Sequence, residues 1–213
     1  MNKKYLPSAL ILYLNYFIHG IGCSILGQQS VKELLAGQWG MSDVMGVTAV
    51  AAALGLGRLI SLPFAGPLSD KLGRKLSVII GCASYVIFFV GIVFSPNMTV
   101  AYVAAVLGGI ANSFLDTATY PAVAEIIHKY TGIATMGIKL FISAAQLLMP
   151  FFLGICVGTA LDVLMLPLVC GIAIAVLGVL AIFAPMPKVE GVGKGESFLN
   201  NLKNAHFSVE SVA

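Results

Sequence analysis

Apolar residues are gathered into six long runs along the chain, separated by short polar segments. The runs cover residues 5–26, 43–65, 76–95, 99–127, 137–159 and 162–183. An α-helix rises about 1.5 Å per residue, so about 20 residues are needed to cross a hydrocarbon core roughly 30 Å thick. Each run reaches this length. The pattern therefore predicts an all-α integral membrane protein with six transmembrane helices.

The composition agrees with this class. Hydrophobic residues make up 59% of the chain and charged residues 10%, with a mean hydropathy of +0.97. A soluble domain of 213 residues could not bury so much apolar surface. The net charge of +3 is therefore interpreted through membrane topology, with the lipid bilayer as the surroundings and no nucleic acid as a partner.

The basic residues predict the orientation of the chain. If the N-terminus is cytoplasmic, the opposite side holds only Lys32, and Arg58 lies inside the membrane. The basic residues on the cytoplasmic side would then be Lys3, Lys4, Lys71, Arg74, Lys75, Lys129, Lys139, Lys188, Lys194 and Lys203. Because Lys and Arg concentrate on the cytoplasmic side of membrane proteins, we expect a multi-pass protein of the cell membrane with both termini in the cytoplasm.

The six runs divide into two sets of three, residues 5–95 and 99–185, which would enter the membrane from opposite sides. Equal length with inverted direction is typical of inverted-repeat transporters. We therefore expect residues 1–185 to form a six-helix bundle built from two inverted three-helix repeats. Residues 186–213 contain Gly, Lys and Glu in place of an apolar run, which favours a cytoplasmic linker after which a seventh span could begin.

Residues 66–75 place four of the chain's few charges between two apolar runs, which predicts a tight charged turn. Pro67 would stop the preceding helix, Gly66 would allow close helix contact, and Gly73 would permit a backbone conformation that other residues resist. Asp70 could accept hydrogen bonds from the start of the following helix. The basic residues that would hold this turn in the cytoplasm are Lys71, Arg74 and Lys75.

This segment matches the signature loop of the major facilitator superfamily, G-x-L-[SA]-D-[RK]-x-G-R-[RK], which joins the second and third transmembrane helices. The matching residues are Gly66, Leu68, Ser69, Asp70, Lys71, Gly73, Arg74 and Lys75. The chain thus resembles the N-terminal six-helix half of a member of this family. The resemblance implies alternating-access transport, a gating role for the loop, and a second six-helix half as partner, either in the same chain or as another subunit.

Two charged residues lie deep inside the apolar runs, where a charge costs at least about 2.5–3.5 kcal/mol on insertion scales. They are Arg58 in the second run and Asp116 in the fourth, and their spacing from the charged helix ends places them at comparable depths. An ion pair would neutralise both, or Arg58 could extend to the cytoplasmic surface. In a functional interpretation, Asp116 takes up and releases a coupling proton, while Arg58 tunes the proton affinity of Asp116 or binds an anionic substrate.

Further polar residues recur at helical spacing. Asn112, Asp116 and Tyr120 share one face of the fourth predicted helix. Asn15 and His19 stand at the same spacing in the first helix, and Lys139, Ser143 and Gln146 form a stripe in the fifth. These residues are explained either by hydrogen bonding and packing between helices or by a water-filled cavity. The family cavity is usually lined by the first, second, fourth and fifth helices, which carry these residues.

Cysteines and glycines complete the interpretation of the apolar runs. All four cysteines, Cys23, Cys82, Cys156 and Cys170, fall in apolar runs without ligand spacing and are interpreted as buried thiols. The glycines expected to allow close helix contact are Gly55, Gly57, Gly108, Gly109, Gly154 and Gly158.

No motif indicates an enzyme. The chain has no phosphate-binding Gly-x-x-x-x-Gly-Lys loop, no His-Glu-x-x-His pattern and no nucleophile elbow. We therefore expect no catalytic residues, no metal and no cofactor. A channel is another competing class, which would show flux without saturation.

The expected function is secondary transport of a small hydrophilic solute, with proton-coupled symport of a sugar or organic anion as the favoured form. A non-functional fragment, or a half-carrier that needs a partner half, is an alternative. A drug/proton efflux antiporter is another. Such antiporters usually place an Arg early in the fourth helix, and none occurs between Thr99 and Tyr120. Their glycine-rich fifth-helix pattern is also reduced here, at residues 149–154.

Overall fold

The computed structural model describes residues 3–158 and 162–187 and contains seven α-helices in this part of the chain. They are α1 (Leu6–Ser24), α2 (Gln29–Gln38), α3 (Met45–Leu72), α4 (Arg74–Val93), α5 (Met98–Ile126), α6 (Thr131–Gly158) and α7 (Met165–Phe183). Six of them are long and apolar enough to cross a membrane, whereas α2, with 10 residues, is too short. The six predicted spans and the all-α class are confirmed. The predicted linker lies outside the described residues from residue 188 on.

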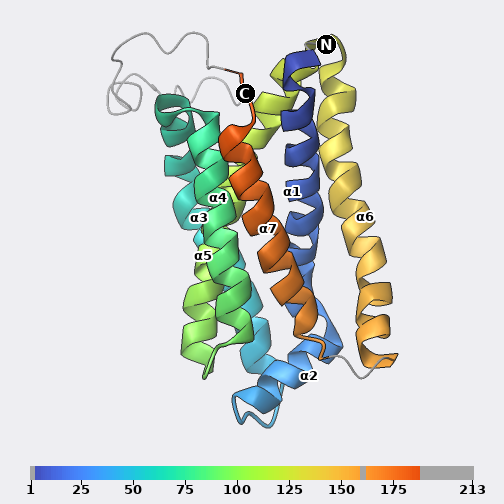
Figure 1. Ribbon diagram of the computed structural model, residues 1–213. Helices are drawn as coiled ribbons and strands as arrows, with labels where there is room; N and C mark the ends of the chain where they lie inside the picture. The colour runs from blue at the N-terminus through green and yellow to red at the C-terminus, as the bar shows by residue number, and fades with distance from the viewer. Residues whose placement is uncertain (1–2, 159–161, 188–213) are drawn as a thin grey trace, which may run out of the picture.

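The six long helices form one bundle (Figure 1). Helix α5 packs along α3 and α4 and also contacts α1 and α6, while α1 packs against α6 and α7. Successive spans alternate in direction, so α5, which opens the second set of three, starts at the opposite end of the bundle from α1. Helix α6 is the least enclosed span and has few contacts with α7.

Two hydrogen bonds bring three segments to one end of the bundle. The Ser8 hydroxyl donates to the carbonyl oxygen of Pro185 at 2.6 Å, which joins the start of α1 to the residues after α7. Lys75 Nζ donates to the carbonyl oxygen of Ile182 at 2.8 Å, which joins the start of α4 to the end of α7. The signature segment therefore lies at the same end of the bundle as the start of α1 and the end of α7.

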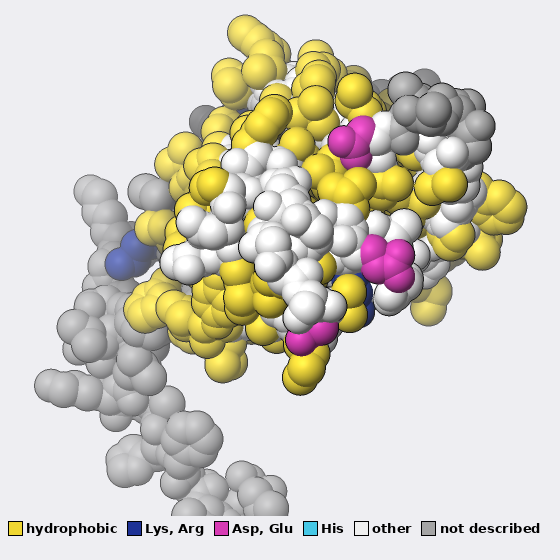
Figure 2. All heavy atoms as spheres, turned by 90° about the horizontal axis from the view of Figure 1, so that it is seen from below, with side chains coloured by type: hydrophobic (Ala, Val, Ile, Leu, Met, Phe, Trp, Pro, Cys, Tyr) yellow, Lys and Arg dark blue, Asp and Glu magenta, His cyan; other side chains and the backbone are white. Residues whose placement is uncertain are grey.

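The opposite end carries α2 and is rich in carboxylates (Figures 1 and 2). Its exposed acidic residues are Glu33, Asp43 and Asp162. Asp43 Oδ1 accepts a hydrogen bond from the backbone N–H of Met45, and Asp162 Oδ1 accepts one from Leu164, so each carboxylate lies at a helix start. Negative charge is favourable there because the first backbone N–H groups of a helix have no partner within the helix.

The signature segment differs from its prediction because α3 does not end at Pro67. The helix continues through Pro63 and Pro67 to Leu72, and α4 begins at Arg74. The ten-residue turn is thus reduced to Gly73, whose φ of 88° confirms the predicted need for glycine. Proline is tolerated inside membrane helices because neighbouring groups can satisfy the freed backbone carbonyls.

Four other expectations, about the signature segment, the segment 28–42 and the start of α6, are wrong. Gly66 permits no close contact, because a Cβ atom there would meet only a Thr117 methyl group at 4.0 Å. No side chain caps the start of α4, so Asp70 does not fill that role. The polar segment 28–42 contains helix α2 instead of a simple loop, and α6 begins at Thr131, six residues earlier than the predicted 137.

The closest helix contact is between α3 and α5, and glycine makes it. A Cβ atom on Gly57 would lie 2.1 Å from the Val106 carbonyl oxygen, and one on Gly109 would lie 2.1 Å from the Leu54 carbonyl oxygen. Gly108 is also tightly packed. Gly55 and Gly154 have nothing within 4 Å, so the predicted role of these two in close packing is wrong.

Candidate functional site

The two charges predicted deep in the membrane form an ion pair. Arg58 on α3 donates from Nη2 to Oδ2 of Asp116 on α5, at 2.7 Å. The tight α3–α5 contact at Gly57 and Gly109 allows this distance, because it brings the two backbones close together just beside the pair. The Asp116 side chain is 17% exposed and the Arg58 side chain 50% exposed, so the Arg58 side of the pair is accessible at the surface of the described bundle.

Asp116 has a second partner that the sequence did not reveal. Tyr16 on α1, which is fully buried, donates from its hydroxyl to Asp116 Oδ1 at 2.5 Å. The carboxylate is therefore held by one donor at each oxygen, and the two donors come from two different helices. Hydrogen bonds to an ionised carboxylate are shorter and stronger than neutral ones. A tyrosine in an apolar run carries no signal that distinguishes this contact from ordinary packing.

Two serine hydroxyl groups fix the backbone at Arg58. Ser61 donates to Ser113 at 2.7 Å, and Ser113 lies 3.2 Å from the Arg58 carbonyl oxygen. Both side chains are buried between α3 and α5. They tie the helix segment that carries Arg58 to the helix that carries Asp116.

Tyr120 and Lys139 extend the site toward the end of the bundle that the charge pattern predicts to be cytoplasmic. The Tyr120 ring meets the Tyr16 ring edge to face, with centroids 5.7 Å apart. Lys139 on α6 places its Nζ 5.3 Å from the centroid of the Tyr120 ring, a cation–π contact. The sequence placed Lys139 on a polar stripe but not in the site, although the structure connects it to Asp116 through two aromatic rings.

A second polar cluster joins α1, α4 and α5. The Tyr85 hydroxyl lies 2.9 Å from Nδ1 of His19 and is also hydrogen-bonded to the amide oxygen of Asn112. Cys23 lies 3.5 Å from Nε2 of His19 and 3.7 Å from the same amide oxygen. Cys23 is exposed, so its prediction as a buried thiol is wrong, whereas Cys82, Cys156 and Cys170 are buried.

Two of the predicted cavity residues do not join the ion pair. Asn15 is fully buried against α4, where its Oδ1 accepts a weak hydrogen bond from Cys82 at 3.7 Å. Gln146 on α6 donates to the Ser24 hydroxyl at 2.9 Å, near the far end of α1. Asn15 thus belongs to the bundle interior, and Gln146 links α6 to α1.

The charged residues of the signature segment are divided between exposed and buried positions. Asp70 and Lys71 are exposed in the last turn of α3. Arg74 is buried, with 8% of its side chain exposed, and pairs with Glu125 of α5 at 2.5 Å. This second ion pair fastens α4 to α5 at the same end of the bundle as the start of α1.

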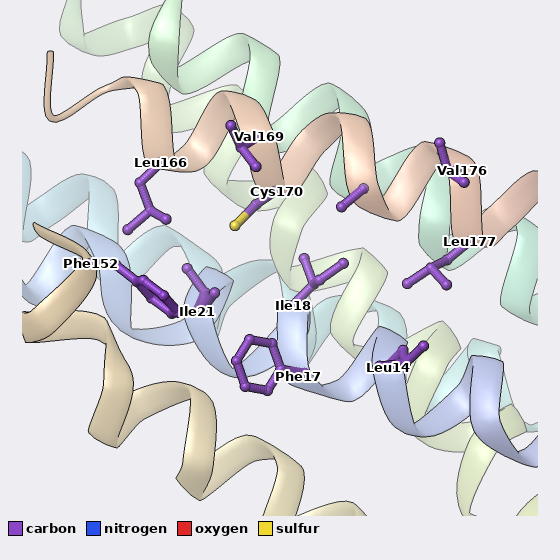
Figure 3. A pocket seen from close by; sticks show the side chains of 11 residues that line it. Leu14, Phe17, Ile18, Ile21, Phe152, Leu166, Val169, Cys170, Val176 and Leu177 are labelled. Atoms are coloured by element: carbon purple, nitrogen blue, oxygen red, sulfur yellow. The ribbon is translucent and has the colours of Figure 1, made fainter. Parts of the chain in front are cut away.

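An apolar groove lies apart from these polar groups. It has a volume of about 590 Å³, lies between α1, α6 and α7 (Figure 3), and only apolar side chains line it. Leu14 and Ile18 of α1 face Cys170 and Leu177 of α7 across it. Such a lining suits hydrocarbon and offers no group that could bind a hydrophilic solute, so the candidate site is the accessible surface around the Arg58–Asp116 pair.

Several membrane transport proteins are similar in sequence to this chain. The inner membrane transport protein YdiM of Escherichia coli (strain K12) is 40% identical over 163 residues, which are 76% of this chain and 39% of YdiM. Inner membrane transport protein YdiN of the same organism is 39% identical over 151 residues, 70% of this chain and 35% of YdiN. Multidrug resistance protein 2 of Bacillus subtilis (strain 168) is 31% identical over 144 residues, 64% of this chain and 32% of that protein.

The chain spans less than two fifths of the length of these relatives. A family model described as Major Facilitator Superfamily matches residues 12–210. This match covers most of the chain, including the α3–α4 junction where the signature residues lie. The chain therefore belongs to the major facilitator superfamily.

Proposed function

We propose that this chain is part of a secondary transporter that moves a small hydrophilic solute, such as a sugar or an organic anion, by alternating access and in symport with protons. The observation that carries the proposal is the Arg58–Asp116 ion pair, which lies in the interior of the spans α3 and α5 and leaves Arg58 half exposed. A charge at this depth is costly, and such residues usually mark ion or substrate pathways. Membership of the family supports the transport class.

Asp116 is the proton-coupling group in this proposal. When its carboxylate is ionised, Arg58 and Tyr16 both donate to it. Protonation would remove the negative charge and release the Arg58 guanidinium to meet a substrate. Tyr120 contacts Tyr16 and Lys139 lies over the Tyr120 ring, so both could influence this proton exchange through Tyr16.

A second six-helix half is part of the proposal, because the relatives are more than twice as long as the part that this chain matches. Helix α3 leaves large apolar side chains exposed around Arg58, among them Leu59, Ile60 and Phe64. In an alternating-access carrier, this surface would pack against the second half and close the solute path. The signature segment at the α3–α4 junction would act as the gate on the cytoplasmic side.

Drug/proton efflux is a second candidate, because the relative from Bacillus subtilis is named a multidrug resistance protein. Two features of this chain favour symport instead. The fourth span, α5, has no Arg between Thr99 and Tyr120, and residues 149–154 lack the glycine-rich antiporter pattern. The candidate site also includes two cations, Arg58 and Lys139, and one carboxylate, which disfavours the cationic compounds that many drug pumps would carry.

The test is proton-coupled flux in liposomes that contain the full chain, alone and co-produced with the remaining C-terminal part of YdiM. Glucose and gluconate are added outside, and a trapped pH-sensitive dye reports proton entry. We expect one solute to carry protons inward with saturable kinetics. Asp116→Asn should abolish this proton entry while solute counterflow persists, whereas Asp162→Asn, which changes an exposed carboxylate at the α2 end, should have no effect.

Three results would contradict the proposal. Proton entry that is unchanged in Asp116→Asn would remove the coupling role of this carboxylate. Flux that rises linearly with solute concentration, without counterflow, would indicate a channel. Protons that leave as the solute enters would indicate the antiporter alternative.

A further inference from the structure

Cations outnumber carboxylates in the interior of the described spans. Apart from side chains in the first or last turns of the helices, the charged residues of α1 and α3–α7 in the described ranges are Arg58, Asp116 and Lys139. Asp116 neutralises one of the two cations. The site is therefore left with one positive charge that no carboxylate in the described part of the chain balances.

The surplus charge is connected to the ion pair through two aromatic side chains. Lys139 lies over the Tyr120 ring, Tyr120 contacts Tyr16, and Tyr16 donates to Asp116. The two cations, one on α3 and one on α6, are therefore linked through Asp116 and the rings of Tyr16 and Tyr120.

Both cations keep donors that could bind a ligand. The Arg58 side chain is half exposed, and Nη2 is its only donor with a partner among the described residues. A guanidinium has five N–H donors in a planar fork that matches a carboxylate. Lys139 is exposed, and its ammonium group contacts an aromatic face, not a carboxylate, within the described ranges. An anion in contact with these groups would accept charge-assisted hydrogen bonds from both cations.

We propose that the solute is an organic anion with a single carboxylate, held between the Arg58 guanidinium and the Lys139 ammonium. This inference rests on the proposed transport function and narrows its solute class by excluding neutral sugars. One carboxylate balances the one surplus positive charge of the site. The rings of Tyr16 and Tyr120 would border the remainder of the solute.

The experiment measures binding to the purified full chain in lipid nanodiscs, by isothermal calorimetry at constant ionic strength. The probes are gluconate, lactate and benzoate, each paired with the neutral compound that has CH₂OH in place of the carboxylate: glucitol, propane-1,2-diol and benzyl alcohol. We expect saturable binding of at least one carboxylate and at least tenfold weaker binding of its neutral partner. Absence of binding by all three carboxylates would overturn the inference.

Variants of two lysines test the site itself. Lys139→Gln should weaken carboxylate binding about tenfold or more, and Lys139→Arg should restore most of it, because a charge-assisted hydrogen bond is lost and regained. Lys129→Gln is the matched control, since Lys129 makes a similar contact, 5.4 Å from the Tyr130 ring, just before α6 begins. Unchanged binding in Lys139→Gln would overturn the inference.

The two proposals can fail separately. If glucose entry carries protons and depends on Asp116, the transport function holds and the anionic solute class fails. If carboxylates bind through Lys139 but no proton flux accompanies them, the site holds and proton coupling fails. Equal binding of gluconate and glucitol would also reject the solute class, whatever the flux measurements show.

Discussion

Asp116 is held in place by two hydrogen-bond donors of different kinds, a guanidinium group and a tyrosine hydroxyl. Arg58 donates to one carboxylate oxygen at 2.7 Å and Tyr16 to the other at 2.5 Å. A buried ion pair recovers its desolvation cost only when further hydrogen bonds satisfy the remaining lone pairs. Tyr16 supplies such a bond. The tyrosine therefore fixes the position of the Asp116 carboxylate and links α1 to α5.

Removing the Tyr16 hydroxyl should destabilise the protein more than removing the Tyr13 hydroxyl, which α1 also donates to another helix. Tyr16→Phe loses a hydrogen bond to a carboxylate, a kind of bond that contributes about 1.5–3 kcal/mol. Tyr13→Phe loses a bond to the backbone oxygen of Ala134, and neutral bonds between membrane helices average about 0.6 kcal/mol. Thermal unfolding of both variants in detergent provides the comparison. If Tyr16→Phe lost no more thermal stability than Tyr13→Phe, the result would contradict the hydrogen bond assigned between Tyr16 and Asp116.

These contacts also show how much of the site could be predicted from the sequence. Arg58 and Asp116 could be predicted, because a charge inside an apolar run needs a partner and each of these charges had one natural candidate at a similar depth. Tyr16 and Tyr85 could not. A tyrosine in such a run is compatible with packing, with the membrane interface or with a hydrogen bond, and only the arrangement of the helices decides among them.

At the scale of elements, the α3–α5 contact positions the site. Glycines at positions 57 and 109 let the two backbones approach, and the Arg58–Asp116 pair lies immediately beside them. The two serine hydroxyls that link Ser61, Ser113 and the Arg58 carbonyl oxygen lie in the same interface. The ion pair is therefore a consequence of close helix packing. Loosening this packing should disrupt both the ion pair and the serine hydrogen bonds.

Two glycines of α3, only two residues apart, provide a matched test of this packing. Gly57→Ala would place a methyl group 2.1 Å from the Val106 carbonyl oxygen, so the helices must separate. Overpacking of this kind typically costs about 1–3 kcal/mol. Gly55→Ala meets nothing within 4 Å and should stabilise the helix by up to about 1 kcal/mol, because alanine favours helix. Thermal unfolding should therefore shift in opposite directions, and a similar shift in both variants would contradict the role of Gly57.

The elements were easier to predict than their ends. Each of the six spans follows from apolar runs of sufficient length, because backbone groups in lipid must be satisfied within a helix. The end of α3 was misplaced at Pro67, since proline ends helices in water far more often than it does in membranes. Helix α2 was missed because a polar segment of 10 residues resembles a loop in the sequence. Only the structure shows that Gln38, the last residue of α2, is hydrogen-bonded to Ser95, just after α4.

At the scale of the whole molecule, the two ends of the bundle differ in charge. The end that holds the α3–α4 junction carries most of the described basic residues, including Lys71, Arg74 and Lys129. The α2 end carries Lys32 together with three exposed carboxylates. The hydrogen bonds of Ser8 and Lys75 place the outer ends of the first and last spans at the basic end. The basic end should therefore face the cytoplasm.

Cysteine labelling tests this orientation directly. The starting variant has all four cysteines replaced by alanine and receives one new cysteine, either by Glu33→Cys at the α2 end or by Lys71→Cys at the basic end; both positions are exposed. In intact cells, a membrane-impermeant maleimide should label the chain with Glu33→Cys. The chain with Lys71→Cys should be labelled only after the membrane is permeabilised, because positive residues are retained in the cytoplasm. The reverse pattern would place the signature segment outside the cell, where it could not gate the cytoplasmic side.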